Sequence, residues 1–208
     1  MRYKAILFDM DGTLLDTLTD MADAVNHILS VHGWPLRTIE EVRAFVGNGA
    51  RRLMERAVPP EVTGGDFEAV LTEYRDWYQA HNCVATAPYP GIPALLAALA
   101  EAGVKTAVVS NKPDATTKTL AARFFPGLPA FGQRDDVPPK PAPDLVFRAL
   151  ETLGVDAADA IYVGDSEVDV ATARNAGLPL AAVSWGFRGR RALAEAGAAV
   201  IVDTAAEL

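Results

Sequence analysis

The sequence is poor in cysteine, with Cys83 as its single thiol among 208 residues. One cysteine cannot close a disulfide within the chain or build a thiolate metal site, and a free thiol is typical of a reducing compartment. The segment around it, HNCVAT at 81–86, lacks the glycine-rich turn that would expose a nucleophile. We therefore interpret Cys83 as structural.

Long hydrophobic runs and excess positive charge are also missing. The longest apolar run, 94–100, is far shorter than the ~20 residues that span a bilayer. Lys and Arg number 19 against 27 Asp and Glu, a net charge of −8, which is the wrong sign for binding nucleic acid through its phosphates. The first residues, MRYKAILFDMDGT, carry acids where a secretory signal would be apolar. We expect no membrane or nucleic-acid partner and a cytoplasmic location.

The composition is that of a globular protein, with 50% hydrophobic and 22% charged residues. A short buried strand is predicted at 4–8, and beyond residue 90 helix-prone segments alternate with strand-like ones. The later strands are predicted at 104–109, 130–132, 160–164, 180–184 and 199–202. Such alternation predicts an α/β fold whose core is a Rossmann-like parallel sheet with helices on both faces.

Residues 16–84 follow a different periodicity. Apolar side chains recur every three or four positions over 17–32 and again from Phe67 to His81, which predicts two amphipathic helices. Shorter helices are predicted at 39–46 and 50–57, with no convincing strand between them. We predict an all-helical cap domain at 16–84, inserted into an α/β core formed by 1–15 and 85–208.

Polar side chains follow several predicted strands, and the carboxyl ends of parallel strands gather where the winding direction reverses. The candidates are Asp9, Asp11, Ser110, Asn111, Asp165 and the isolated Lys140. Asp9 and Asp11 are two residues apart, so in an extended chain their carboxylates point to the same side. Such crowding is costly unless a cation or a proton neutralises it.

The oxygen-only set of Asp9, Asp11 and Asp165 suits a hard ion. Mg²⁺ fits best, because it binds few protein ligands and leaves room for phosphate oxygens. Ser110 and Asn111 at a helix start, together with Lys140, have the hydrogen-bond donors and the charge to hold a phosphate. We therefore predict a Mg²⁺ cofactor and a phosphate-bearing ligand.

Four segments, in order along the chain, resemble the motifs of the haloacid dehalogenase superfamily of phosphohydrolases. They are FDMDGTLLDT at 8–17, VVSNK at 108–112, PKPAPD at 139–144 and GDSEVDVATARNAG at 164–177. The helical insertion after the first motif, together with YPGIPALLAAL, KPAPD and SWGFR, resembles the branch that includes phosphoglycolate phosphatases. The resemblance covers essentially the whole chain. It implies an enzyme that hydrolyses a small phosphorylated metabolite such as 2-phosphoglycolate.

The resemblance assigns a role to each core acid. Asp9 would be the nucleophile and a Mg²⁺ ligand, forming an aspartyl-phosphate. Asp11 would be the general acid and base, and would also contact the metal through its backbone carbonyl. Asp165 would be the remaining metal ligand.

The resemblance also assigns Ser110 and Lys140 to the phosphate, beside Asn111. Asp169 would orient Lys140 or a metal-bound water. Glu167 is left open between a contribution to the metal site and a solvated acid in the first turn of a helix.

In the cap, Gly47, Asn48 and Gly49 stand where this branch has its specificity loop, and Arg51 and Arg52 follow directly. Successive helical residues point about 100° apart, so at most one of the two arginines faces the site. We expect Asn48, the loop amides and one arginine, with Arg51 as the candidate, to contact the non-phosphate end of the substrate. A plain turn between helices is the alternative.

The same residues argue against several alternative activities and leave others open. A dehalogenase needs no leaving-group acid such as Asp11, and a phosphonoacetaldehyde hydrolase needs a cap lysine, whereas 16–84 contains none. A receiver-like signalling domain would not carry a helical insertion. A β-phosphoglucomutase-like phosphomutase, or a phosphatase for a nucleotide, sugar phosphate or pyrophosphate, stays open. We expect a monomer or a homodimer.

Overall fold

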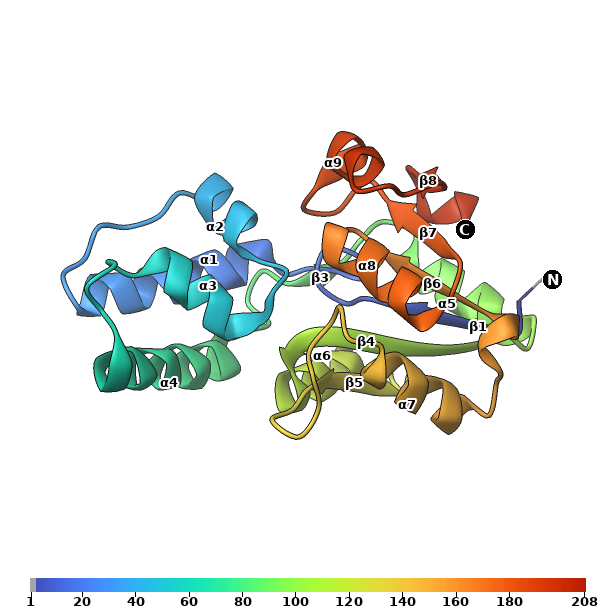
Figure 1. Ribbon diagram of the computed structural model, residues 1–208, viewed down its shortest axis with the longest axis horizontal. Helices are drawn as coiled ribbons and strands as arrows, with labels where there is room; N and C mark the ends of the chain where they lie inside the picture. The colour runs from blue at the N-terminus through green and yellow to red at the C-terminus, as the bar shows by residue number, and fades with distance from the viewer. Residues whose placement is uncertain (1–2) are drawn as a thin grey trace.

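The computed structural model describes residues 3–208 and shows two lobes joined by β2 and β3 (Figure 1). We call the lobe that contains the main sheet the core, and the lobe of α1–α4 the helical lobe. The strands of the core sheet are β1 (Ala5–Phe8), β4 (Lys105–Pro113), β5 (Ala130–Gln133), β6 (Ala160–Gly164), β7 (Leu180–Val183) and β8 (Ile201–Val202). The core helices are α5 (Ile92–Glu101), α6 (Asp114–Phe124), α7 (Asp144–Leu153), α8 (Glu167–Ala176) and α9 (Gly189–Glu195), with 3₁₀ turns at Ala157–Asp159 and Ala205–Glu207.

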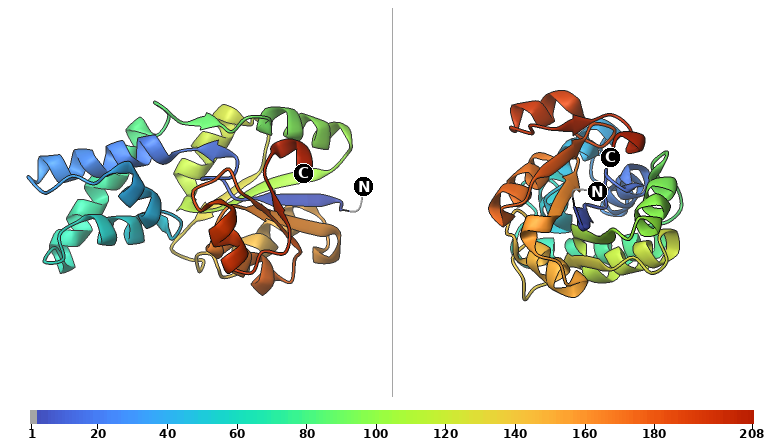
Figure 2. Two further views of the ribbon diagram at one scale, coloured as in Figure 1. Left: turned by 90° about the horizontal axis from the view of Figure 1, so that it is seen from above. Right: turned by 90° about the vertical axis from the view of Figure 1, so that its right-hand side faces the viewer.

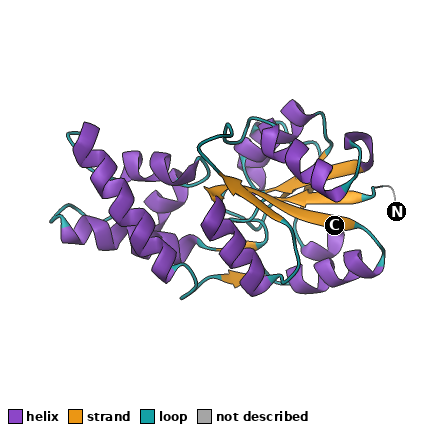
Figure 3. Cartoon of the chain, turned by 90° about the horizontal axis from the view of Figure 1, so that it is seen from below, coloured by secondary structure: helices purple, strands orange, loops and turns teal. Residues whose placement is uncertain are grey.

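The core sheet has helices on both faces, as Figure 3 shows. Its strands are all parallel, in the order β5-β4-β1-β6-β7-β8. Alternate residues of β1 point to opposite faces: Ile6 and Phe8 pack with α5 and α6, whereas Ala5 and Leu7 pack with α7 and α8. Burial on both faces explains why the strands read as continuous apolar runs. The predicted α/β fold with a parallel, Rossmann-like sheet is confirmed.

The direction of winding reverses at β1. After the helical lobe, the chain builds β4 and β5 on one side of β1, then crosses through α7 to build β6 and β7 on the other side. The carboxyl ends of β1, β4 and β6 therefore adjoin at one edge of the sheet, which is where open α/β sheets bind ligands.

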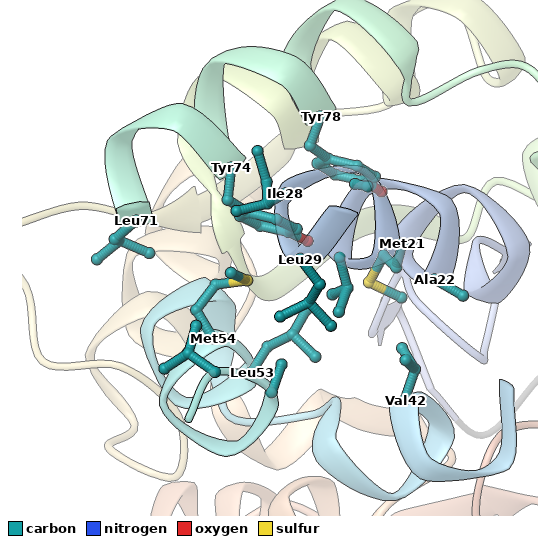
Figure 4. Close-up of a cluster of buried hydrophobic side chains, with 14 of the residues drawn as sticks. Met21, Ala22, Ile28, Leu29, Val42, Leu53, Met54, Leu71, Tyr74 and Tyr78 are labelled. Atoms are coloured by element: carbon teal, nitrogen blue, oxygen red, sulfur yellow. The ribbon is translucent and has the colours of Figure 1, made fainter. Parts of the chain in front are cut away.

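The helical lobe consists of α1 (Leu18–Val31), α2 (Ile39–Phe45), α3 (Gly49–Ala57) and α4 (Gly64–His81), and it projects from one end of the sheet (Figure 2). Its apolar side chains form a buried cluster of their own, in which Met21, Leu29, Met54 and Tyr74 face one another (Figure 4). These residues occupy the apolar stripes that predicted the helices. All four helices lie within 16–84, and the domain boundaries themselves stay a prediction. No helix within 3–208 is both long and apolar enough to cross a bilayer.

The two crossings between the lobes form a small ribbon that the sequence did not reveal. β2 (Leu15–Asp16) pairs antiparallel with β3 (Ala87–Pro88). Strands of two residues are too short to show a periodicity, so the sequence predicts only connecting segments at both places. A second difference is that β4 continues past the predicted end at 109 to Pro113, which carries Lys112 within the strand.

A buried carboxylate fastens the returning crossing to α1. Asp20 is 1% exposed and accepts hydrogen bonds from the backbone N–H groups of Val84, Ala85 and Thr86 at 3.1, 2.8 and 2.9 Å. The Thr86 hydroxyl donates a further bond at 2.7 Å. One side chain therefore satisfies several donors of an irregular segment that has no ladder partner there.

We predict that Asp20→Ala lowers the free energy of unfolding by about 3 kcal/mol, because it leaves these buried donors without an acceptor. In a chain of this size that loss corresponds to a melting temperature lower by roughly 6–12 °C. Asp23→Ala, an exposed acid on the same helix, is the matched control and should change the melting temperature little. Equal melting temperatures for the two variants would show that Asp20 does not fasten the crossing.

Candidate active site

A cavity of about 330 Å³ lies between the two lobes, at the edge of the sheet where the winding reverses. This volume is at the small end of the range for sites that bind small molecules. Its lining residues from the core include Asp9, Asp11, Ser110, Asn111, Lys112 and Asp165. Those from the helical lobe include Met21, Val46, Gly47, Gly49, Leu53, Tyr74 and Tyr78.

The turn after β1 places Asp9 and packs against Asp165. The N–H of Asp9 donates to Val163 O at 2.8 Å, and Asp9 Oδ1 accepts the N–H of Met10 at 2.7 Å. Gly12 has a φ of +80°, and a Cβ atom there would collide with the Asp165 carboxylate. Glycine is therefore required both by the left-handed backbone and by the close approach of the two segments.

Asp165 is held by donors from two loops. Its Oδ2 accepts the N–H of Phe187 at 2.7 Å, and its Oδ1 accepts the Thr13 hydroxyl at 3.2 Å. The residue is 1% exposed. The loop after β7 and the turn after β1 thus both fix this carboxylate beside Asp9.

Lys140 is buried between two carboxylates. Its Nζ lies 3.0 Å from Asp9 Oδ1 and 2.8 Å from Asp169 Oδ1, and it donates to Tyr162 Oη at 3.1 Å. Asn111 braces the Lys140 backbone: it accepts the Lys140 N–H at 2.7 Å and donates to Lys140 O at 3.0 Å. A buried ammonium is stable only with such partners.

Asp169 and Lys140 are both buried, and neither is among the residues that line the cavity; Lys140 reaches the lining through its contact with Asp9. It occupies the third position of α8 and forms a capping box with Ser166, whose hydroxyl donates to Asp169 Oδ2 at 2.6 Å. One carboxylate oxygen therefore serves the helix start while the other contacts Lys140.

Burial dominates the electrostatics of the acids. It raises the pKa of Asp9 to about 7, and although the Lys140 charge opposes this shift, the Asp169 and Asp11 charges add to it. Burial likewise raises the pKa of Asp165 well above its usual range, with Asp169 and Asp9 adding to the effect. For Lys140, burial acts to lower the pKa, but the charges of Asp169 and Asp9 outweigh it and hold the pKa well above its ordinary value.

The site carries more negative than positive charge. Counting only the groups clustered at the sheet edge, and leaving out Arg75, Asp76 and Arg188 elsewhere in the cavity lining, the carboxylates are Asp9, Asp11, Asp165 and Asp169 and the ammonium groups are Lys112 and Lys140. Four negative and two positive groups leave an excess of two negative charges when all are ionised. Oxygens of Asp9, Asp165 and Asp169 lie within 4.8 Å of one another. This donor set and this excess charge fit a divalent cation.

The remaining predicted core residues lie at the same edge. Ser110 is 1% exposed, lines the cavity and accepts the N–H of Lys112 at 3.2 Å. Asn111 also lines it, but its amide is engaged by the Lys140 backbone and, at 3.4 Å, by Gly47 O of the helical lobe. The expected donation from Asn111 to a phosphate thus competes with its contacts to the protein.

The structure brings the glycines of the predicted specificity loop to the cavity but not the arginine. Gly47 and Gly49 line it, and Asn48 directly precedes α3. Arg51 is exposed and forms a two-pronged ion pair with Glu68 of α4, at 2.7 and 2.8 Å. Arg52 pairs with Glu55 at 2.6 Å. Neither arginine is among the lining residues, because acids on the helical lobe itself hold both elsewhere.

Among the lining residues that the sequence does not predict as site residues are Lys112, Tyr78 and Arg188. Lys112 and Tyr78 line the cavity from opposite lobes. Arg188, in the loop after β7, donates to Arg43 O at 2.7 Å and to Val46 O at 2.6 Å, so it bridges the core and the end of α2. Lys112 ends the VVSNK segment and Arg188 ends the SWGFR segment, but the resemblance assigns a role to neither residue.

Arg188 also forms an ion pair with Glu167. Its Nε lies 3.0 Å from Glu167 Oε2, and that side chain is half exposed. Glu167 is not among the clustered carboxylates found within residues 3–208. The structure thus places Glu167 in an ion pair at the border between the lobes.

Comparison with known proteins agrees with this fold. The chain is 36% identical over its full length to 94% of the N-acetylmuramic acid 6-phosphate phosphatase of Pseudomonas aeruginosa. It is 37% identical, over 96% of this chain and 89% of the relative, to a plasmid-encoded phosphoglycolate phosphatase of Cupriavidus necator. A crystal structure of a candidate phosphoglycolate phosphatase from Lactobacillus delbrueckii subsp. bulgaricus superposes with a TM-score of 0.94 at 38% identity, covering 100% of this chain and 97% of that one.

The family profile of haloacid dehalogenase-like hydrolases matches residues 6–183, which contain both the sheet edge and the helical lobe. The resemblance inferred from the four motifs is confirmed. This chain therefore belongs to the haloacid dehalogenase-like hydrolase family, among its phosphatases.

Proposed function

We propose that the protein hydrolyses a small phosphate monoester in a Mg²⁺-dependent reaction that passes through an aspartyl-phosphate on Asp9. The observation that carries this proposal is the position of Asp9, which lines the cavity with its Oδ1 atom 3.0 Å from the buried Lys140 ammonium. Within residues 3–208, the hydrogen bond from Met10 and the ion pair with Lys140 both engage Oδ1 of the Asp9 carboxylate. Oδ2 is therefore the oxygen available to attack phosphorus.

Each group has a defined task in the proposed reaction. Asp9 forms a bond to phosphorus as the bond to the leaving oxygen breaks, and Asp11 gives its proton to that oxygen. Asp11 then takes a proton from the water that cleaves the aspartyl-phosphate. Lys140 and Ser110 contact the phosphoryl oxygens. Mg²⁺, held by Asp9, Asp165 and the backbone carbonyl of Asp11, would supply positive charge beside these oxygens.

The substrate is proposed on chemical grounds. The relatives' names make 2-phosphoglycolate one candidate, since this compound combines a phosphate with a carboxylate. A second candidate is a bulkier ester such as a sugar phosphate, because Met21, Leu53 and Tyr74 form apolar parts of the cavity lining and the expected Arg51 is turned away. Arg75 and Arg188 also line the cavity, so a second anionic group on the substrate has possible partners there. A cytoplasmic location and a monomeric or homodimeric state stay predictions.

The activity is tested by phosphate release with Mg²⁺ from a panel of 2-phosphoglycolate, sugar phosphates, nucleotides and pyrophosphate. Asp9→Asn should lower kcat by at least ~10³-fold for the best substrate, because the amide keeps the shape but cannot form the covalent intermediate. A melting curve for the variant separates this loss from unfolding. Near-normal turnover by Asp9→Asn would contradict the mechanism, and transfer to a sugar hydroxyl would indicate a mutase.

The metal is tested without an activity measurement. Saturating Mg²⁺ should raise the melting temperature of the wild-type protein by about 5 °C, because the ion binds only the folded state and neutralises the crowded carboxylates. Asp165→Asn should lose this shift. Asp203→Asn, which changes an exposed acid paired with Arg190, should keep it. If the wild-type protein does not respond to Mg²⁺, the proposed cofactor is wrong.

The specificity loop is tested by comparing a glycine with the arginine that follows it. Gly49 has a φ of +81°, and a Cβ atom there would lie 2.8 Å from Gln133 Oε1 and 3.3 Å from Asn111 O. Gly49→Ala should therefore shift the loop and lower kcat/KM by about 10-fold, whereas Arg51→Ala should change it less than about 2-fold. A larger loss of kcat/KM for Arg51→Ala than for Gly49→Ala would show that Arg51 contacts the substrate and would contradict this prediction.

A further inference from the structure

The proposed reaction leaves one buried charged group of the cavity without a task. Lys112 is buried, and its Nζ lies 3.1 Å from Asp11 Oδ1 and donates to Tyr78 Oη at 2.8 Å. The ammonium also lies 4.6 Å from the centre of the Tyr78 ring. Lys112 therefore joins the turn after β1 to α4 of the helical lobe, through a strand of the core sheet.

The Asp11 carboxylate is held by different contacts from those that hold the carboxylates of Asp9 and Asp165. Asp9 accepts the N–H of Met10 and Asp165 accepts the N–H of Phe187, so rigid backbone fixes both carboxylates. Within residues 3–208, the Asp11 carboxylate is contacted by two side chains, the Thr17 hydroxyl at 2.8 Å and the Lys112 ammonium. Its orientation consequently depends on where those side chains lie.

Both of these contacts engage Asp11 Oδ1, which leaves Oδ2 as the oxygen available for proton transfer. A lysine is a flexible four-carbon chain ending in a point charge, so one ion pair does not fix its rotamer. The Tyr78 hydroxyl and ring supply the additional contacts that do. Burial and then the charge of Asp11 raise the pKa of Tyr78 well above its usual range, so the hydroxyl stays neutral beside the ammonium.

We propose that Lys112 and Tyr78 are positioning residues, which orient the Asp11 carboxyl for proton transfer only while the helical lobe is seated on the core. This inference rests on the proposed phosphatase reaction, in which Asp11 protonates the leaving oxygen. When α4 moves away, Lys112 loses its partner from the helical lobe and Asp11 loses a constraint on its orientation. The bond from Lys112 to Tyr78 thus couples the closed arrangement of the lobes to the acid.

The alternative role for Lys112 is direct binding of a substrate anion. The two roles differ in their kinetic signature. Loss of an anion-binding group weakens binding and raises KM for every phosphate ester. Loss of acid positioning lowers kcat, and does so most for esters whose leaving group needs a proton.

The test compares Lys112→Met, which keeps the length of the side chain, with Tyr78→Phe, which keeps the ring, and with the double variant. Lys118→Met removes an exposed lysine that pairs with Asp114 and is the matched control. Each protein is assayed with para-nitrophenyl phosphate, whose leaving group needs little protonation, and with the best alkyl phosphate of the panel. Asp11→Asn supplies the reference difference between the two substrates.

We expect Lys112→Met to lower kcat for the alkyl ester by about 10–100-fold and for the aryl ester by less than about 3-fold. Tyr78→Phe should show the same preference at roughly 3–10-fold, with KM nearly unchanged. The double variant should be no worse than Lys112→Met alone, because both changes remove one linkage. Lys118→Met should match the wild-type protein.

Equal losses on both esters, a change in KM alone, or effects that multiply in the double variant would overturn the proposal. If melting curves show that Lys112→Met is unfolded, Tyr78→Phe decides the question, because it removes one hydroxyl and keeps the packing. If the wild-type protein shows no Asp9-dependent hydrolysis, the proposed function fails and the positioning role fails with it. Uniform losses in a protein that does hydrolyse esters remove the positioning role alone.

Discussion

The crowding of buried carboxylates at the carboxyl ends of β1 and β6 is the constraint on which the site depends. Burial raises the pKa of Asp9 and Asp165, so this arrangement is costly without compensation. The fold supplies part of that compensation through Lys140, which is pinned between Asp9 and Asp169. The remaining negative charge suits a divalent cation, which in the proposed reaction would in turn offset the charge of a phosphate.

The helical lobe and the core together enclose the cavity. The core alone presents the acids, Ser110 and Lys140 on an open sheet edge, whereas the cavity exists only because α3 and α4 lie over that edge. Arg188 and Lys112 both line the cavity, and each bridges the core to the helical lobe, through Val46 O and the Tyr78 hydroxyl respectively. The same contacts that enclose a substrate therefore also reach the side chains that would act on it.

The sequence predicted the fold, and it predicted that Asp9, Asp11 and Asp165 gather at one edge of the sheet, because both depend on local signals; the roles of these acids stay a prediction. Apolar strands ending in acidic turns predicted where Asp9 and Asp165 meet. What could not be predicted depends on pairs far apart in the chain. Arg51 leaves the cavity because Glu68 of the next helix holds it, and Lys112 gains its partner only when α4 packs on the core. Neither contact has a periodicity or motif that marks it.

Trapping the covalent intermediate tests the central claim most directly. The protein is mixed with Mg²⁺ and an intact ester that it hydrolyses, and the reaction is quenched in acid within a single turnover. The quenched protein is then digested and analysed by mass spectrometry. We expect a phosphoryl group on the peptide that contains Asp9 at early quench times. It should be lost at later quench times and absent at all times from Asp9→Asn. Phosphate release through full turnovers with no phosphoryl group on that peptide at any quench time, or with the group on another residue, would contradict it.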